Sequence, residues 1–115
     1  MEYLYWNSSQ LIQAYNTKEL SPVEVIEASI SRAQKMQPIC NAITEYFEEK
    51  AINMAKEAEL SYLGKTDKPR LLEGIPLAVK EQFALEGSYR TSGSFIYKNR
   101  IDNFTDVYIK RLLNG

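Results

Sequence analysis

The chain has 115 residues, of which 44% are hydrophobic, 25% charged and 11% aromatic, a composition typical of globular proteins. Its 14 lysines and arginines nearly balance its 15 aspartates and glutamates, which argues against a nucleic-acid module or a polybasic membrane binder. With no histidine and one cysteine, Cys40, it contains no Ser-His-Asp triad, Cys-His dyad, histidine-ligated zinc site or thiolate metal cluster.

The first predicted elements are two helices. A short helix is expected to be capped by Ser8 or Ser9 and to end near Thr17. A second helix begins at Ser-Pro-Val-Glu, residues 21–24, which combines an N-cap serine, a first-turn proline and a capping-box glutamate. This helix is expected to end near Pro38. Its predicted apolar stripe comprises Val23, Ile26, Ile30 and Ala33.

A strand and a third helix are predicted next. Residues 41–46 are rich in β-branched and aromatic side chains, which favours a strand. The helix that follows has Glu48 and Glu49 in its first turn, and Gly64 is placed to end it. Residues 65–70 are polar and are expected to form an exposed connection. The predicted apolar face of this helix comprises Ala51, Met54, Ala55, Ala58 and Tyr62.

The remainder of the chain is predicted to contain a buried strand, a loop-rich segment and a last helix. The run Leu77–Val79 is of the kind that is buried on both faces of a sheet, and it ends at Lys80. Residues 83–101 contain glycines and hydroxyl side chains and are expected to form loops. The last helix is predicted over about 104–113.

Two groups are candidates for chemistry. Lys80 follows the predicted strand, where open α/β sheets place ligand-binding groups, and a neutral lysine can act as a base toward a serine hydroxyl. A solvated lysine at the end of a strand is the alternative. The stretch Thr91, Ser92, Gly93 and Ser94 is either a hydroxyl-lined substrate-binding loop near this site or an ordinary polar turn.

Several segments together resemble the N-terminal part of the amidase signature family. The central one is Glu73-Gly-Ile-Pro-Leu-Ala-Val-Lys80-Glu-Gln-Phe, in which Glu81 stands where the family more often has aspartate. The order and spacing of the segments extend the resemblance over nearly all of the chain. The other matching segments are 20–26, 41–43, 85–87, 91–94 and 105–115.

The resemblance implies hydrolysis or transfer of an amide by a Ser–cis-Ser–Lys triad, in which Lys80 is the lysine. It implies no cofactor and no metal. Both family serines lie in a Gly/Ser-rich segment that nothing in residues 1–115 resembles, so the isolated chain is predicted to be inactive. The alternatives are a non-catalytic interaction module derived from an amidase, and a segment of the A-type subunit of a tRNA-dependent amidotransferase.

The fold class predicted from these observations is α/β, with N-terminal helices and a partial mixed sheet, as a fragment of the amidase signature fold. Residues 1–115 are expected to form a single incomplete domain, mainly helical over 1–64 and with strand, loop and helix over 71–115. The expected partners are a small-molecule amide and a second or complementing chain that covers the strand, with no nucleic acid and no membrane. One cysteine, no secretory signal and no long apolar run favour the cytoplasm.

Overall fold

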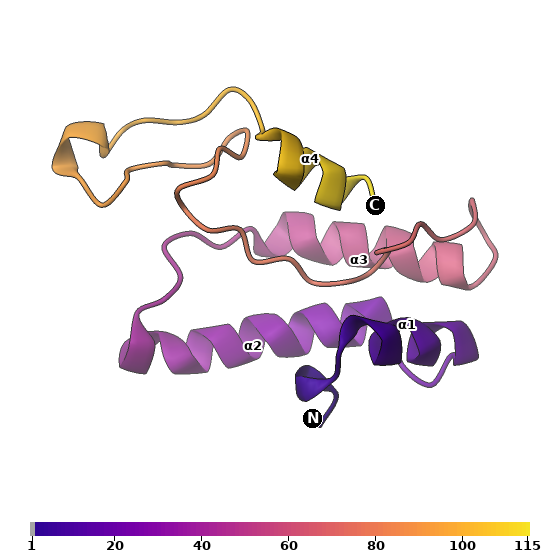
Figure 1. The fold of residues 1–115 in the computed structure, drawn as a ribbon. Coiled ribbons are helices and arrows are strands. Elements are labelled where there is room, and N and C mark those ends of the chain that lie inside the picture. The colour runs from indigo at the N-terminus through magenta and orange to yellow at the C-terminus, as the bar shows by residue number, and fades with distance from the viewer. Residues whose placement is uncertain (1) are drawn as a thin grey trace. The chain divides into compact units, whose positions relative to one another are not determined.

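The computed structural model describes residues 2–115, which divide into two compact units, one through Pro76 and the other Leu77–Gly115 (Figure 1). No helix in this described part is long and apolar enough to cross a membrane. The helices of the first unit are η1 (Glu2–Tyr5), α1 (Ser8–Thr17), α2 (Pro22–Cys40) and α3 (Glu48–Tyr62). Those of the second unit are η2 (Phe95–Tyr97) and α4 (Val107–Leu113).

Helix α1 is capped by Asn7, which precedes both of the predicted caps. The Asn7 side chain accepts a hydrogen bond from the Gln10 amide at 3.0 Å, and the Gln10 side chain accepts one from the Asn7 amide at 2.9 Å. This reciprocal pair satisfies two amides that have no partner inside the helix. The prediction that Ser8 or Ser9 caps the helix is therefore wrong.

Helix α2 begins as predicted but ends later. The Ser21 hydroxyl accepts from the Val23 amide at 3.0 Å, and the Glu24 carboxylate accepts from the Ser21 amide at 2.9 Å, so the capping box is confirmed. The helix continues past Pro38 to Cys40, because Asn41 closes it in a left-handed conformation (φ 46°). Its most buried residues are Pro22, Val25 and Ala28, whereas the predicted stripe of Val23, Ile26, Ile30 and Ala33 is half-buried.

The core of the first unit joins α1, α2 and α3. Figure 1 shows α2 and α3 lying side by side. The Tyr15 and Tyr62 rings pack with their centroids 5.3 Å apart, and only 1% of Tyr15 is exposed. The buried side chains of this cluster are Leu11, Tyr15, Val25 and Tyr62, with Tyr3, Trp6, Leu20 and Ile75 packed against them.

Residues 41–46 form a loop and not the predicted strand. The side-chain amide of Gln37 donates to the Ile43 carbonyl at 2.7 Å and accepts from the Ile43 amide at 3.0 Å. One side chain thus makes the two hydrogen bonds that a neighbouring strand would make. β-branched and aromatic residues favour an extended backbone, but an extended segment forms a strand only when it pairs with another strand.

Helix α3 and its end agree with the sequence. Gly64 adopts φ 71° and its amide donates to the Ser61 carbonyl at 3.0 Å, while the Lys65 amide donates to the Leu60 carbonyl at 2.9 Å. These bonds close the helix in the way that a C-terminal glycine favours. Residues 65–70 are exposed apart from Pro69, which is half-buried. The buried residues are Ala55, Ala58, Ser61 and Tyr62; the predicted Met54 is exposed.

The predicted strand before Lys80 is also absent, and with it the partial mixed sheet. Residues 71–74 form a turn, and residues 75–80 are irregular with no ladder partner in the described part of the chain. Pro76 has no amide to donate, and Leu77 is 44% exposed. An apolar run of this length becomes a buried strand only beside other strands, and residues 2–115 contain no more than one isolated antiparallel bridge, Tyr89 to Ile101.

The turn at 71–74 is held by the two core tyrosines instead. The Tyr15 hydroxyl donates to the Gly74 carbonyl at 3.1 Å, and the Tyr62 hydroxyl donates to the Glu73 carbonyl at 3.0 Å. Burial raises the pKa of both phenols, so each stays protonated and able to donate. Gly74 itself has φ 78°, and a Cβ there would lie 2.9 Å from the Pro22 ring.

Helix α4 begins at Val107, later than predicted. The residue before it, Asp106, is paired with Ala84: its carboxylate accepts from the Ala84 amide at 2.7 Å, and its own amide donates to the Ala84 carbonyl at 3.0 Å. The Thr105 hydroxyl accepts from the Glu86 amide at 3.0 Å. Thr105 and Asp106 are therefore held by the segment at 84–86 and do not join the helix.

Two glycine substitutions separate backbone strain from packing. Gly64→Ala meets no atom within 4 Å, so its cost should be that of a left-handed alanine, about 1–2 kcal/mol. Gly74→Ala adds a clash with Pro22 and Tyr15 and should cost about 1–3 kcal/mol more. Urea unfolding of both variants tests this, and equal midpoints would contradict the packing of the turn against α2.

Candidate functional site

Lys80 lies in the second unit, at the end of the irregular segment and the start of a turn. Its carbonyl accepts from the Phe83 amide at 3.0 Å, which closes the turn. Its side chain is exposed, and within residues 2–115 its amine makes no hydrogen bond or ion pair. The lysine therefore follows an irregular segment and not a buried strand, and its amine is accessible.

Glu81, the next residue, is hydrogen-bonded to the predicted hydroxyl loop, residues 91–94. A single carboxylate oxygen, Oε1, accepts from the Thr91 hydroxyl at 2.7 Å and from the Ser92 amide at 3.2 Å, and it also accepts from the Thr91 amide. Three donors thus converge on one atom. The chain at 91–92 is in this way attached to the residue beside Lys80.

Arg100 holds the same loop through other atoms. Its Nη2 donates to the Ser92 hydroxyl at 2.9 Å, and its Nε donates to the Arg90 carbonyl at 2.6 Å. The guanidinium stacks over the Tyr97 ring at 4.2 Å from the centroid, which fixes its plane. The Glu81 carboxylate therefore holds two amides and one hydroxyl of the loop, and the Arg100 guanidinium holds the Ser92 hydroxyl.

Within the loop the four predicted residues have different roles. Ser92 has φ 53° and Gly93 has φ 66°, so the chain reverses through two left-handed residues. The Thr91 hydroxyl also accepts from the Gly93 amide at 3.3 Å. Ser94 caps η2, its hydroxyl accepting from the Ile96 amide at 3.3 Å. Thr91 and Ser92 are therefore bonded to Glu81, whereas Ser94 caps η2.

An ion pair between Arg90 and Asp102 closes the base of this loop. Arg90 and Asp102 form two parallel bonds, Nε to Oδ2 at 2.7 Å and Nη2 to Oδ1 at 2.8 Å. Backbone bonds run beside them, from the Arg90 amide to the Arg100 carbonyl at 3.0 Å and from the Asp102 amide to the Ser88 carbonyl at 3.1 Å. Asp102 is buried, and both oxygens of its carboxylate take part in this paired geometry.

The charges of the two carboxylates are stabilised by these contacts. The hydrogen bond from the Thr91 hydroxyl, followed by those from the loop amides, lowers the pKa of Glu81. The hydrogen bond from Arg90 lowers the pKa of Asp102 in the same way. Both groups are therefore ionised at neutral pH, and the contacts that they make weaken only as the pH falls through the lowered pKa values.

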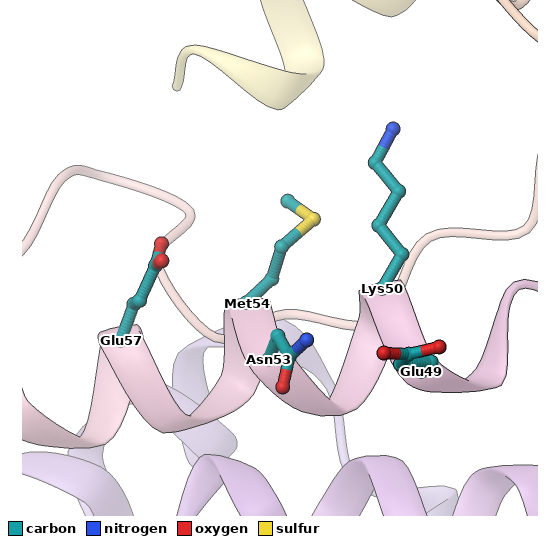
Figure 2. Close-up of a pocket in the computed structure, with 5 residues that line it drawn as sticks. All are labelled: Glu49, Lys50, Asn53, Met54 and Glu57. Atoms are coloured by element: carbon teal, nitrogen blue, oxygen red, sulfur yellow. The ribbon is translucent and has the colours of Figure 1, made fainter.

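A separate pocket lies on α3 in the first unit. Figure 2 shows Lys50, Met54 and Glu57 projecting from the same side of this helix, with Glu49 and Asn53 beside them. It contains neither Lys80 nor any residue of the hydroxyl loop. No group of three or more His, Cys, Asp or Glu side chains suited to a metal ion is present in the described part of the chain.

The sequence predicts Lys80 and the loop as site residues, but it does not predict the residues that hold the loop. It marks Glu81 only as a replacement for aspartate, and it does not single out Arg100. The available signal is the pairing of charges across the loop-rich segment, with Glu81 and Asp102 against Arg90 and Arg100. Their partners are about ten positions away along the chain, so no local pattern selects them.

The sequence model of the Amidase family matches residues 24–115, which include Lys80, Glu81, the loop and Arg100. The chain belongs to the amidase family. The match extends from the first turns of α2 through α4, so it covers parts of both compact units.

Relatives with assigned names are much longer than this chain. The A-type subunit of glutamyl-tRNA(Gln) amidotransferase from Carboxydothermus hydrogenoformans is 27% identical over 97% of the chain and 23% of its own length. Its counterpart in Orientia tsutsugamushi is 33% identical, over 87% and 19%. Human fatty-acid amide hydrolase 2 is 29% identical, over 97% and 22%. The chain spans about a fifth of the length of these relatives.

A solved structure has the same fold over 93% of this chain. It is described as an unexpected vestigial protein complex that reveals the evolutionary origins of an s-triazine catabolic enzyme, and it superposes with a TM-score of 0.82. It is 24% identical and covers 93% of this chain and 23% of its own. The helical arrangement found here is therefore that of one part of a larger fold.

The Arg90–Asp102 pair should control how often the base of the loop opens. At neutral pH Asp102→Asn removes the charge with little change in shape, so exchange of the Arg90 amide, which bonds to Arg100, should accelerate severalfold. Hydrogen exchange measured by NMR at matched pH tests this, with Asp67→Asn on the exposed connection as the control. The difference from wild type should shrink as the pH falls through the lowered Asp102 pKa; a difference that persists in acid would contradict an ionic cause.

Proposed function

We propose that this chain provides the lysine-bearing segment of an amidase-type catalytic unit that cleaves or transfers a small-molecule amide. Lys80 is the proton-accepting group, and the loop of Thr91, Ser92, Gly93 and Ser94 lies against the substrate. The observation that carries the proposal is the family match over 24–115, combined with an exposed lysine that directly precedes Glu81, the residue that holds the loop.

In the proposed reaction the Lys80 amine acts as the base and accepts a proton from a bridging serine. That serine takes the proton of a second serine, whose oxygen attacks the amide carbonyl and forms an ester as the amine leaves. The proton returns through the same relay to the leaving nitrogen, and water or another acceptor then cleaves the ester. The serines would come from a part of the catalytic unit outside the residues matched here. An accessible amine that no carboxylate of residues 2–115 engages is suited to receive such a partner.

Two related functions are supported by particular observations. Relatives named as A-type subunits of glutamyl-tRNA(Gln) amidotransferase favour amide transfer over hydrolysis, in which case ammonia leaves for a second acceptor. Exposed apolar side chains favour a role in binding another chain. The chemistry needs no cofactor or metal, and the free thiol of Cys40 favours a reducing, cytoplasmic location.

Lys80 should be essential to turnover when this chain is joined to a serine-bearing amidase segment. Lys80→Ala should lower the rate of amide hydrolysis by about 10²–10⁴-fold, because the proton relay is lost. Lys80→Arg should be nearly as inactive, because a guanidinium stays charged and accepts no proton. Steady-state hydrolysis of a panel of small amides, glutamine included, measures both effects and separates hydrolysis from glutamine-dependent transfer.

Lys98→Ala is the matched control, since Lys98 is an exposed lysine of the same unit. It should leave the rate unchanged. Full turnover in either Lys80 variant would refute the proposed role, and circular dichroism of each variant establishes that the helices are retained.

The isolated chain should associate with itself or with a complementing chain. Phe95 and Ile96 are 91% and 86% exposed, and Leu71 is 81% exposed, although such side chains are normally covered in a folded protein. Sedimentation velocity over a range of concentrations should show a species larger than 13.2 kDa that decreases in Phe95→Ser/Ile96→Ser. A compact monomer at all concentrations would contradict this expectation.

A further inference from the structure

Resting on the proposed function, we propose that Glu81 is a positioning residue that holds the Thr91–Gly93 turn beside Lys80. Its carboxylate is the point at which the turn is attached to the lysine-bearing segment. If the turn faces the substrate, Glu81 sets where the substrate lies relative to the amine. Nothing in this role requires Glu81 to touch the reacting atoms.

Three hydrogen-bond donors of the turn converge on the Glu81 carboxylate. Oε1 of Glu81 accepts the amides of two consecutive residues, Thr91 and Ser92, and the Thr91 hydroxyl. Consecutive amides that point to one side of a turn form a concavity suited to an anion. Here the anion belongs to the chain itself. A charged acceptor makes stronger hydrogen bonds than a neutral one. A neutral amide side chain at position 81 would therefore hold the turn less strongly.

The carboxylate also sustains an unfavourable backbone conformation at Ser92. Ser92 is one of three residues other than glycine with positive φ among residues 2–115, and the others, Lys18 and Asn41, end helices. A serine gains nothing from this region, so the surrounding contacts must maintain it. Glu81 bonds the Ser92 amide and Arg100 bonds its hydroxyl, which fixes both the backbone and the side chain of the residue.

Glu81 and Lys80 are neighbours in the chain. Glu81 follows Lys80 directly, and both belong to the turn closed by the Phe83 amide. A displacement of the Glu81 backbone therefore displaces Lys80 as well. Because Thr91 and Ser92 are bonded to this same short segment, the loop and the lysine backbone move together and keep their spacing.

The direct test is made on the 115-residue chain and requires no activity. In wild type the NMR shifts of the Thr91 and Ser92 amide protons should move together as the pH is lowered through the Glu81 pKa, which Thr91 holds below its ordinary value. The charged groups that face Glu81 are Arg90 and Arg100, which keep their charge over this range. In Glu81→Gln both titrations should vanish, and exchange of both amides should be faster. Unchanged titration and exchange in this variant would overturn the proposal.

Glu86→Gln provides the matched control. Glu86 is an exposed glutamate in the same unit, and its contact with Thr105 is made by its backbone amide and not by its carboxylate. Its substitution should leave the Thr91 and Ser92 amides as in wild type. Glu81→Asp keeps the charge on a side chain one methylene shorter, and it should restore part of the titration that Glu81→Gln loses.

Kinetics of the catalytic unit completed with serines then separates positioning from proton transfer. Glu81→Gln should raise KM severalfold more than it lowers kcat, whereas Lys80→Ala should act on kcat. If Lys80→Ala is fully active while the amide titrations follow Glu81, the proposed function fails and the attachment stands. If Lys80→Ala is inactive but Glu81→Gln changes neither KM nor the amides, the positioning role fails alone.

Discussion

Side-chain hydrogen bonds to the backbone are the constraint on which the non-helical half of this chain depends. A backbone amide or carbonyl that leaves water needs a partner, and within residues 2–115 no ladder of strands supplies one. The Gln37 side chain bonds to the backbone of Ile43, and the two core tyrosines bond to the carbonyls of Glu73 and Gly74. Acidic side chains accept hydrogen bonds from the amides of Ala84, Thr91 and Ser92. Each of these bonds attaches an irregular segment to a helix or to a turn elsewhere in the sequence.

The two compact units use this device differently. In the first, the donors are phenols in an apolar core, so their bonds to the turn at 71–74 are shielded from water and tied to the packing of α1 and α3. In the second, the bonds involve ionised groups, with Glu81 holding the loop and Arg90 paired with Asp102. The first arrangement responds to packing defects, and the second to pH and charge.

This difference bears on the proposed chemistry. The site is made of polar groups that hold one another in place, while the lysine amine is exposed and makes no bond within residues 2–115. The loop and the Glu81 carboxylate therefore hold each other in place, whereas no contact within residues 2–115 fixes the position of the Lys80 amine. A serine-bearing segment that packed over this surface would find the loop already formed and would supply the partner that the amine lacks.

The sequence by itself determined the elements whose causes are local. The capping box at 21–24, the existence of α1, α2 and α3 and the glycine that ends α3 depend on interactions within a few residues, and the family motif around Lys80 is a contiguous string. Only the tertiary structure decided whether the extended segments 41–46 and 75–80 became strands, because a strand exists only where another strand offers its amides and carbonyls. It also decided that Glu81 and Arg100 hold the loop, since hydrogen bonds between residues ten or so positions apart leave no periodic trace in a sequence.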